Sequence, residues 1–92
     1  MEIFDFWVSH FDFEERRVGL LAWTSPRHAA DFATVEILSP SGDLREAAAT
    51  LFAKMRRLDE AGLDLIVAEP VPETGLGIAI MDRLRKAAHG ND

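Results

Sequence analysis

The stretch DLREAAATLFAKMRRLDEAGLDLIVAEP, residues 43–70, predicts a helix followed closely by a strand. Over residues 44–58 apolar side chains recur at the spacing of one helix face, and most charged side chains fall on the other faces. This apolar stripe consists of Leu44, Ala48, Leu51, Met55 and Leu58, broadened by Ala47 and Phe52. Asp43 and Glu46 have capping-box spacing, and Gly62 is a typical helix stop. We therefore expect a helix over residues 43–61.

Three further segments predict strands of one mostly parallel sheet. The continuous apolar runs 18–23 and 65–68 are typical of central strands that are covered on both faces. Between them Ala33, Val35 and Ile37 alternate with polar residues, which predicts a strand near the sheet edge that ends at Ser39. If this edge strand is parallel to 65–68, the intervening helix completes a right-handed βαβ unit. The short link from Trp23 to Phe32 leaves the direction of the edge strand open.

The C-terminal segment has a clear helical pattern, whereas the pattern of the N-terminal segment is ambiguous. Residues 76–88 predict a second helix, with Ile80, Leu84 and Ala87 on its buried side. Residues 1–15 fit a helical stripe and also a strand, and we favour a helix. With 92 residues and no linker or repeat, the chain forms one α/β domain, and we expect three layers with helices around the sheet.

Composition excludes several classes of function. The formal charge of −6, from 16 acidic and 10 basic residues, disfavours direct binding of nucleic acid. The lack of cysteine excludes disulfides and thiolate metal sites. The three histidines lack metal-ligand spacing and no serine lies in a nucleophile elbow, so we expect neither a metal site nor independent catalysis. Nothing indicates export or a membrane span, which favours the cytoplasm.

Strand ends and helix starts of an open α/β sheet meet at one rim, where such folds bind ligands. The candidate ligand or partner contacts there are Ser39, Ser41, Gly42, Glu69, Glu73, Gly75 and Gly77, beside Trp23 and Thr24. Arg83 is a further candidate, unless it forms an internal ion pair with Glu69 or Glu73. Carboxylates at this rim repel free phosphate, so caps and turns explain the serines and glycines better than a phosphate site does. A nucleotide or metal that bridges the carboxylates stays open as an alternative.

Three stretches in order, LSPSGDL at 38–44, residues 47–59, and GLGIAIMDRL at 75–84, resemble one known family. They are similar to the C-terminal domain of the two-domain threonylcarbamoyl-AMP synthases, also called L-threonylcarbamoyladenylate synthases. The resemblance covers roughly residues 16–88 and rests on several linked segments. It implies a Rossmann-like α/β domain, a cytoplasmic location and a role in making threonylcarbamoyladenosine in tRNA, a nucleoside that acts in translation.

In that family a larger, YrdC-like N-terminal domain joins threonine, bicarbonate and ATP, and the resemblance implies ATP and magnesium for the full synthase. The stretch before Arg17 is too short for that domain, so we expect no catalytic residue in these 92 residues. The resemblance implies an accessory domain whose partner is the catalytic domain, in cis or in trans, and whose effect is on the nucleotide site.

Two other functions remain open. The first is a stand-alone protein-binding or self-associating module that uses Phe4, Phe6, Trp7 and Phe11, which makes a homo-oligomer a possible state. The second is a small nucleotide-dependent enzyme, which predicts ATP turnover by this chain alone.

Overall fold

The computed structural model describes residues 2–3, 17–25 and 31–88, which form a four-stranded sheet and two helices. In chain order the elements are β1 (Glu2–Ile3), β2 (Val18–Ala22), β3 (Thr34–Ile37), α1 (Leu44–Asp59), β4 (Leu65–Ala68) and α2 (Leu76–Ala88). The strands lie in the order β1-β4-β2-β3, and every pair is parallel. The predicted α/β class with a parallel sheet is confirmed.

The pairing of β3 settles the direction that the short link had left open. β3 runs parallel to β2, with Leu20 opposite Val35 and Ala22 opposite Ile37. It forms one edge of the sheet, while β2 and β4 are central, as their continuous apolar runs predict. Because β2 pairs in parallel with β3 and with β4, the segment from β3 through α1 to β4 is a parallel βαβ unit.

The N-terminal segment departs from the helix that we expected over residues 1–15. Glu2 and Ile3 form a strand whose backbone pairs with Val67 and Ala68 of β4. Because that edge of β4 offers unpaired backbone groups, strand pairing outweighs the local helical pattern at these two residues. The rest of 1–15, including Phe4, Phe6, Trp7 and Phe11, lies outside the described residues.

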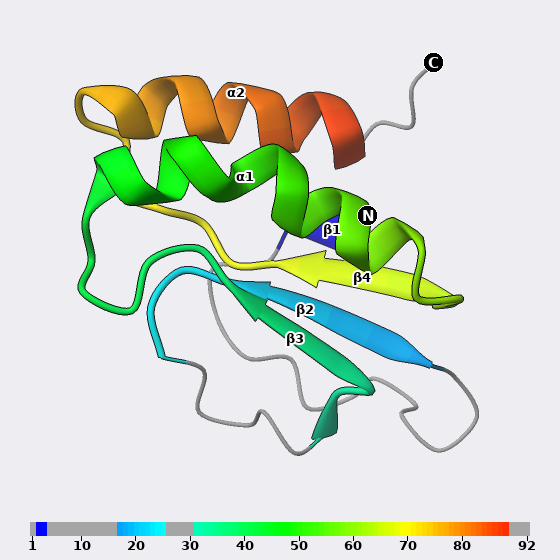
Figure 1. Cartoon of the computed structure of the whole chain (residues 1–92). Coiled ribbons are helices and arrows are strands. Elements are labelled where there is room, and N and C mark those ends of the chain that lie inside the picture. The colour runs from blue at the N-terminus through cyan, green and yellow to red at the C-terminus, as the bar shows by residue number, and fades with distance from the viewer. Residues whose placement is uncertain (1, 4–16, 26–30, 89–92) are drawn as a thin grey trace.

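Both helices pack on the same face of the sheet (Figure 1). Leu51 and Leu58 of α1 and Ile80 and Leu84 of α2 are buried there against Leu21 of β2. A second buried cluster occupies the other face of the sheet and contains Val18, Leu20, Ala22, Phe32 and Val67. The described residues supply two of the three expected layers, and a third would have to come from residues outside them.

Phe52 is not part of the buried stripe in which we placed it. Its side chain is 56% exposed, whereas the neighbouring Leu51 is buried. Each residue of an α-helix is turned by about 100° from the one before it, which carries Phe52 out of the stripe that Leu51 occupies. Neither described helix is long and apolar enough to cross a membrane.

Candidate functional site

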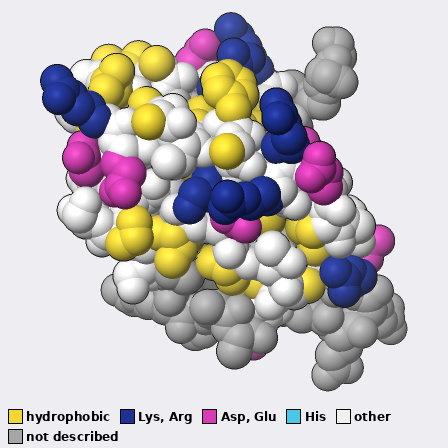
Figure 2. Space-filling model, viewed as in Figure 1, with side chains coloured by type: hydrophobic (Ala, Val, Ile, Leu, Met, Phe, Trp, Pro, Cys, Tyr) yellow, Lys and Arg dark blue, Asp and Glu magenta, His cyan; other side chains and the backbone are white. Residues whose placement is uncertain are grey.

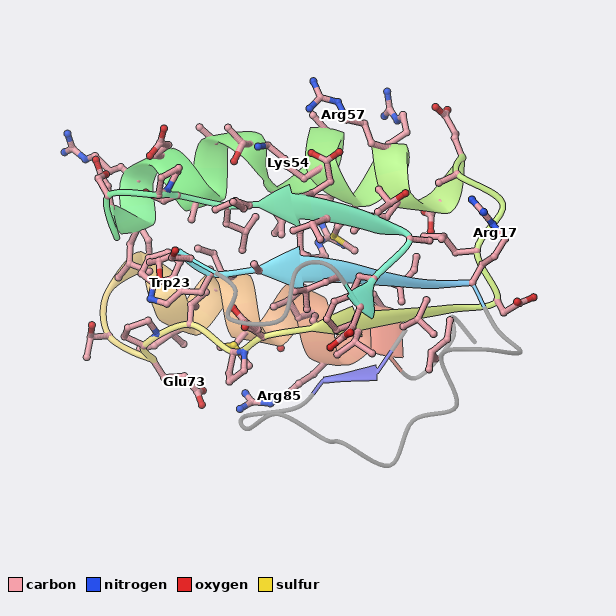
Figure 3. The ribbon with its side chains drawn as sticks, turned by 90° about the horizontal axis from the view of Figure 1, so that it is seen from below. Arg17, Trp23, Lys54, Arg57, Glu73 and Arg85 are labelled. Carbon is pink, nitrogen blue, oxygen red and sulfur yellow. The ribbon has the colours of Figure 1, made fainter. Side chains whose placement is uncertain are left out.

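The carboxyl ends of the strands and the amino ends of both helices meet at one end of the sheet, as predicted. Figure 3 shows Trp23, which follows β2, and Glu73, which precedes α2, at this end, with Arg17 at the opposite end. Backbone hydrogen bonds tie the segments together here, because Ser39 N–H donates to Trp23 O at 3.0 Å and Glu69 N–H donates to Leu21 O at 2.9 Å. We call this end, from residues 23–24, 39–43 and 69–77, the rim.

Ser39 holds the start of α1 and is fully buried. Its hydroxyl donates to Glu46 Oε1 at 2.6 Å and accepts from the Asp43 N–H at 2.8 Å. Ser41 Oγ lies 3.3 Å from the same hydroxyl. The predicted capping box therefore works through an intermediary, since Glu46 reaches the N-cap amide by way of Ser39. With its hydroxyl engaged in this way, Ser39 acts as a structural cap.

The turn before α1 explains Gly42 and leaves Ser41 exposed. Gly42 N–H donates to Ser39 O at 3.0 Å, and the φ of Gly42 is +75°, which side chains other than hydrogen rarely allow. Asp43 then caps the helix, because its Oδ1 accepts from the Arg45 N–H at 2.9 Å. Turn and cap chemistry thus accounts for Gly42.

Glu69 is engaged in the same structural way at the end of β4. Its Oε1 accepts from the backbone N–H of Trp23 at 2.8 Å, so the carboxylate secures the chain as it leaves β2. Residue spacing gave no signal for this contact, which forms because β2 and β4 are neighbours in the sheet. A carboxylate fixed in this way joins two strand ends.

Close packing requires a glycine at position 77. A Cβ at this position would collide with the backbone carbonyl of Pro72. Gly77 N–H donates to Thr74 O at 2.8 Å, which draws the first turn of α2 onto the preceding loop. The close backbone approach at Gly77 is made to Pro72 within this chain. Gly75, with φ +53°, makes the turn that precedes α2.

Glu73 forms an ion pair with Arg85 and not with Arg83. Arg85 Nη2 lies 2.7 Å from Glu73 Oε1, and Nη1 lies 3.0 Å from Oε2, which makes the pair bidentate (Figure 3). The hydrogen bonds and charge of Arg85 lower the pKa of Glu73, and Glu73 raises the pKa of Arg85. The alternative in which Arg83 pairs with Glu69 or Glu73 is not what the structure shows, because two residues of helix turn Arg83 by about 200° from Arg85.

Arg83 instead stacks on an aromatic ring of the other helix. Its guanidinium carbon lies 4.6 Å from the centroid of the Phe52 ring. This cation–π contact joins α1 and α2. Sequence reasoning missed it because Phe52 was assigned to the core; the available signal was that Phe52 lies one residue from the centre of the stripe at Leu51.

The rim carboxylates Glu69 and Glu73 are each engaged by another group of the chain. No three His, Asp or Glu side chains come together as metal ligands among the residues that the structure describes. Glu69 is bound to a backbone amide and Glu73 to Arg85, so neither carboxylate is free of a protein partner. Chemically, the rim is a set of satisfied caps and turns, with Ser41, Gly42, Glu73 and Gly75 exposed on it.

Comparison with known proteins gives a consistent result. The model of the family "Threonylcarbamoyl-AMP synthase, C-terminal domain" matches residues 6–89. The chain is 38% identical over 81 residues to the threonylcarbamoyl-AMP synthase of Pyrococcus abyssi, covering 88% of this chain and 22% of that protein. It is 42% identical over 77 residues to the Bacillus subtilis synthase, covering 82% of this chain and 22% of that protein.

A solved structure has the same fold. The crystal structure of P. abyssi Sua5 complexed with L-threonine superposes with a TM-score of 0.70 at 39% identity, over 83% of this chain and 21% of that one. The chain thus spans about a fifth of the length of the curated relatives it matches.

Proposed function

Because this chain belongs to the family of threonylcarbamoyl-AMP synthase C-terminal domains, we propose that it is an accessory domain that docks on a synthase's catalytic domain and modulates the nucleotide site there. In this proposal threonine, bicarbonate, ATP and magnesium bind the catalytic domain, in the cytoplasm, during synthesis of threonylcarbamoyladenosine for tRNA. This chain supplies a contact surface.

The single observation that carries the proposal is that polar side chains of the rim form hydrogen bonds within the chain. Ser39 and Glu69 are engaged in capping α1 and in joining β2 to β4. An independent metal centre needs a set of ligand side chains, and none comes together among the described residues. A hydrogen-bonded rim with exposed turns at Gly42 and Gly75 instead suits contact with a protein partner.

An activity assay in trans tests the proposal. The partner is the P. abyssi synthase without its matched C-terminal stretch, used in a preparation that binds L-threonine. Pyrophosphate release with threonine, bicarbonate, ATP and magnesium is measured with this chain alone, with the partner alone, and with both. We expect no release by this chain alone and a changed KM for ATP when it is added to the partner. Turnover by this chain alone, or an unchanged KM and kcat at saturating concentrations of the chain, would contradict the proposal.

A further inference from the structure

The solvent-facing surface of the helix pair exposes large apolar side chains. Phe52 is 56% exposed and Leu76 is 45% exposed. On α1, Ala49, Phe52 and Arg56 follow one another at spacings of three and four residues, so they lie on one side of the helix. On α2, Leu76, Ala79 and Arg83 have the same spacing. Arg83 connects the two rows by stacking on Phe52, and we call these six residues the outer helix face. Figure 2 shows hydrophobic side chains exposed over the helices with cationic side chains beside them.

The cations of this face differ from the others on the helices. Arg85, Lys86, Arg57 and Lys54 each lie within ion-pair distance of a carboxylate. Within the described part of the chain, Arg83 and Arg56 have no carboxylate at such a distance. The same holds for Arg45, which lies one helical turn before Ala49. Among the described residues of the two helices, the arginines without a carboxylate at ion-pair distance therefore lie on or beside the surface that also exposes Phe52.

The arrangement favours one kind of occupant. Arg83 is already held against the Phe52 ring, so little side-chain freedom is lost when its guanidinium donates hydrogen bonds to a carboxylate. Phe52, Ala49 and Ala79 offer the adjoining apolar contact, and charge complementarity then requires an acidic partner. Leu76 begins α2 at the rim, so this face is continuous with the surface that the proposed function already uses.

We infer that the outer helix face binds an acidic segment of the synthase's catalytic domain, with an apolar side chain against Phe52 and a carboxylate at Arg83. This inference rests on the proposed function and assigns it a surface.

The test uses two matched pairs of variants. Phe52→Ser and Arg83→Gln alter the face, and Ile78→Ser and Arg57→Gln make the same changes elsewhere on the helices. Arg57 pairs with Glu36 of β3, and two residues of helix turn Ile78 by about 200° from Leu76, so neither belongs to the face. The affinity of each full chain for the truncated P. abyssi synthase is measured by isothermal titration at low and high salt, after circular dichroism has shown a folded protein.

We expect Phe52→Ser and Arg83→Gln each to weaken binding by at least tenfold. Ile78→Ser and Arg57→Gln should change it by less than about twofold, and Arg83→Gln should reduce the salt dependence. If the parent chain binds and the two face variants bind equally well, the inference is overturned and the proposed function stands. If the parent chain does not bind at all, the proposed function fails with it. Self-association of the parent in sedimentation that Arg83→Gln abolishes would make a second copy the occupant and would also overturn the inference.

Discussion

Replacing Ser39 by alanine separates a capping role from a ligand-binding role. The substitution removes a hydroxyl that is fully buried, donates to Glu46 at 2.6 Å and accepts from the Asp43 N–H at 2.8 Å. Both partners then lose a hydrogen bond at the first turn of α1. Loss of a cap costs about 0.5–2 kcal/mol, and leaving buried groups unsatisfied costs about 1–3 kcal/mol. Because Asp43 and Glu46 are themselves exposed and water can reach them, we expect about 1–2 kcal/mol.

Urea denaturation followed by circular dichroism measures this loss, and Ser41→Ala is the matched control. Ser41 is exposed and makes only the 3.3 Å contact with Ser39 among the described hydrogen bonds, so its loss should change the free energy of unfolding by less than about 0.5 kcal/mol. In a domain of this size the Ser39→Ala loss should lower Tm by roughly 4–16 °C. Equal effects of the two substitutions would refute the capping role of Ser39.

Three further predictions follow from the core, the rim and the ion pair. Leu51→Ala should cost roughly 2–5 kcal/mol in urea denaturation because it leaves a cavity under α1, and a loss under about 0.5 kcal/mol would mean that the stripe is not buried. Gly77→Ala should destabilise the domain by roughly 1–3 kcal/mol through collision with the Pro72 carbonyl. In an unobstructed helix the same change is favourable by about 1 kcal/mol, so a gain in the free energy of unfolding would contradict the close contact with Pro72. Arg85 lowers the pKa of Glu73, so the pair's stabilisation is present above the ordinary glutamate pKa and is lost as pH falls through the lowered value. Carbon-13 titration should show the Glu73 pKa rising toward its ordinary value in Arg85→Gln, and no rise would contradict the pairing.

The repeating parts of the fold could be predicted because their periods are local. The apolar runs of β2 and β4 predicted strands covered on both faces, and the stripe from Leu44 to Leu58 predicted the buried face of α1. The bounds of β4 and α2 agree with the prediction. The strand at Glu2–Ile3 could not be obtained this way, because it depends on the free edge of β4, which lies more than 60 residues away in the chain.

The position of the rim could be predicted from the sequence, but the contacts within it could not. Parallel topology brings strand ends and helix starts together, so the rim followed from the order of elements. Which side chains are used there depends on distances across the fold. Glu69 meets the Trp23 amide because β2 and β4 are neighbours, and Arg85 rather than Arg83 reaches Glu73 because of the phase of α2. Ligand or partner contact by the eight candidate residues stays a prediction.

The central claim, that this domain acts through contact with a catalytic domain and not through chemistry of its own, is tested most directly by backbone amide shifts. The labelled chain is titrated with ATP and magnesium, and separately with the truncated P. abyssi synthase. We predict no shifts with ATP and magnesium, and shifts with the synthase at the rim, around Trp23, Gly42 and Gly75, and over the outer helix face. Shifts at the rim with ATP and magnesium alone, or shifts with the synthase confined to the opposite end near Arg17 and Gly62, would contradict the account.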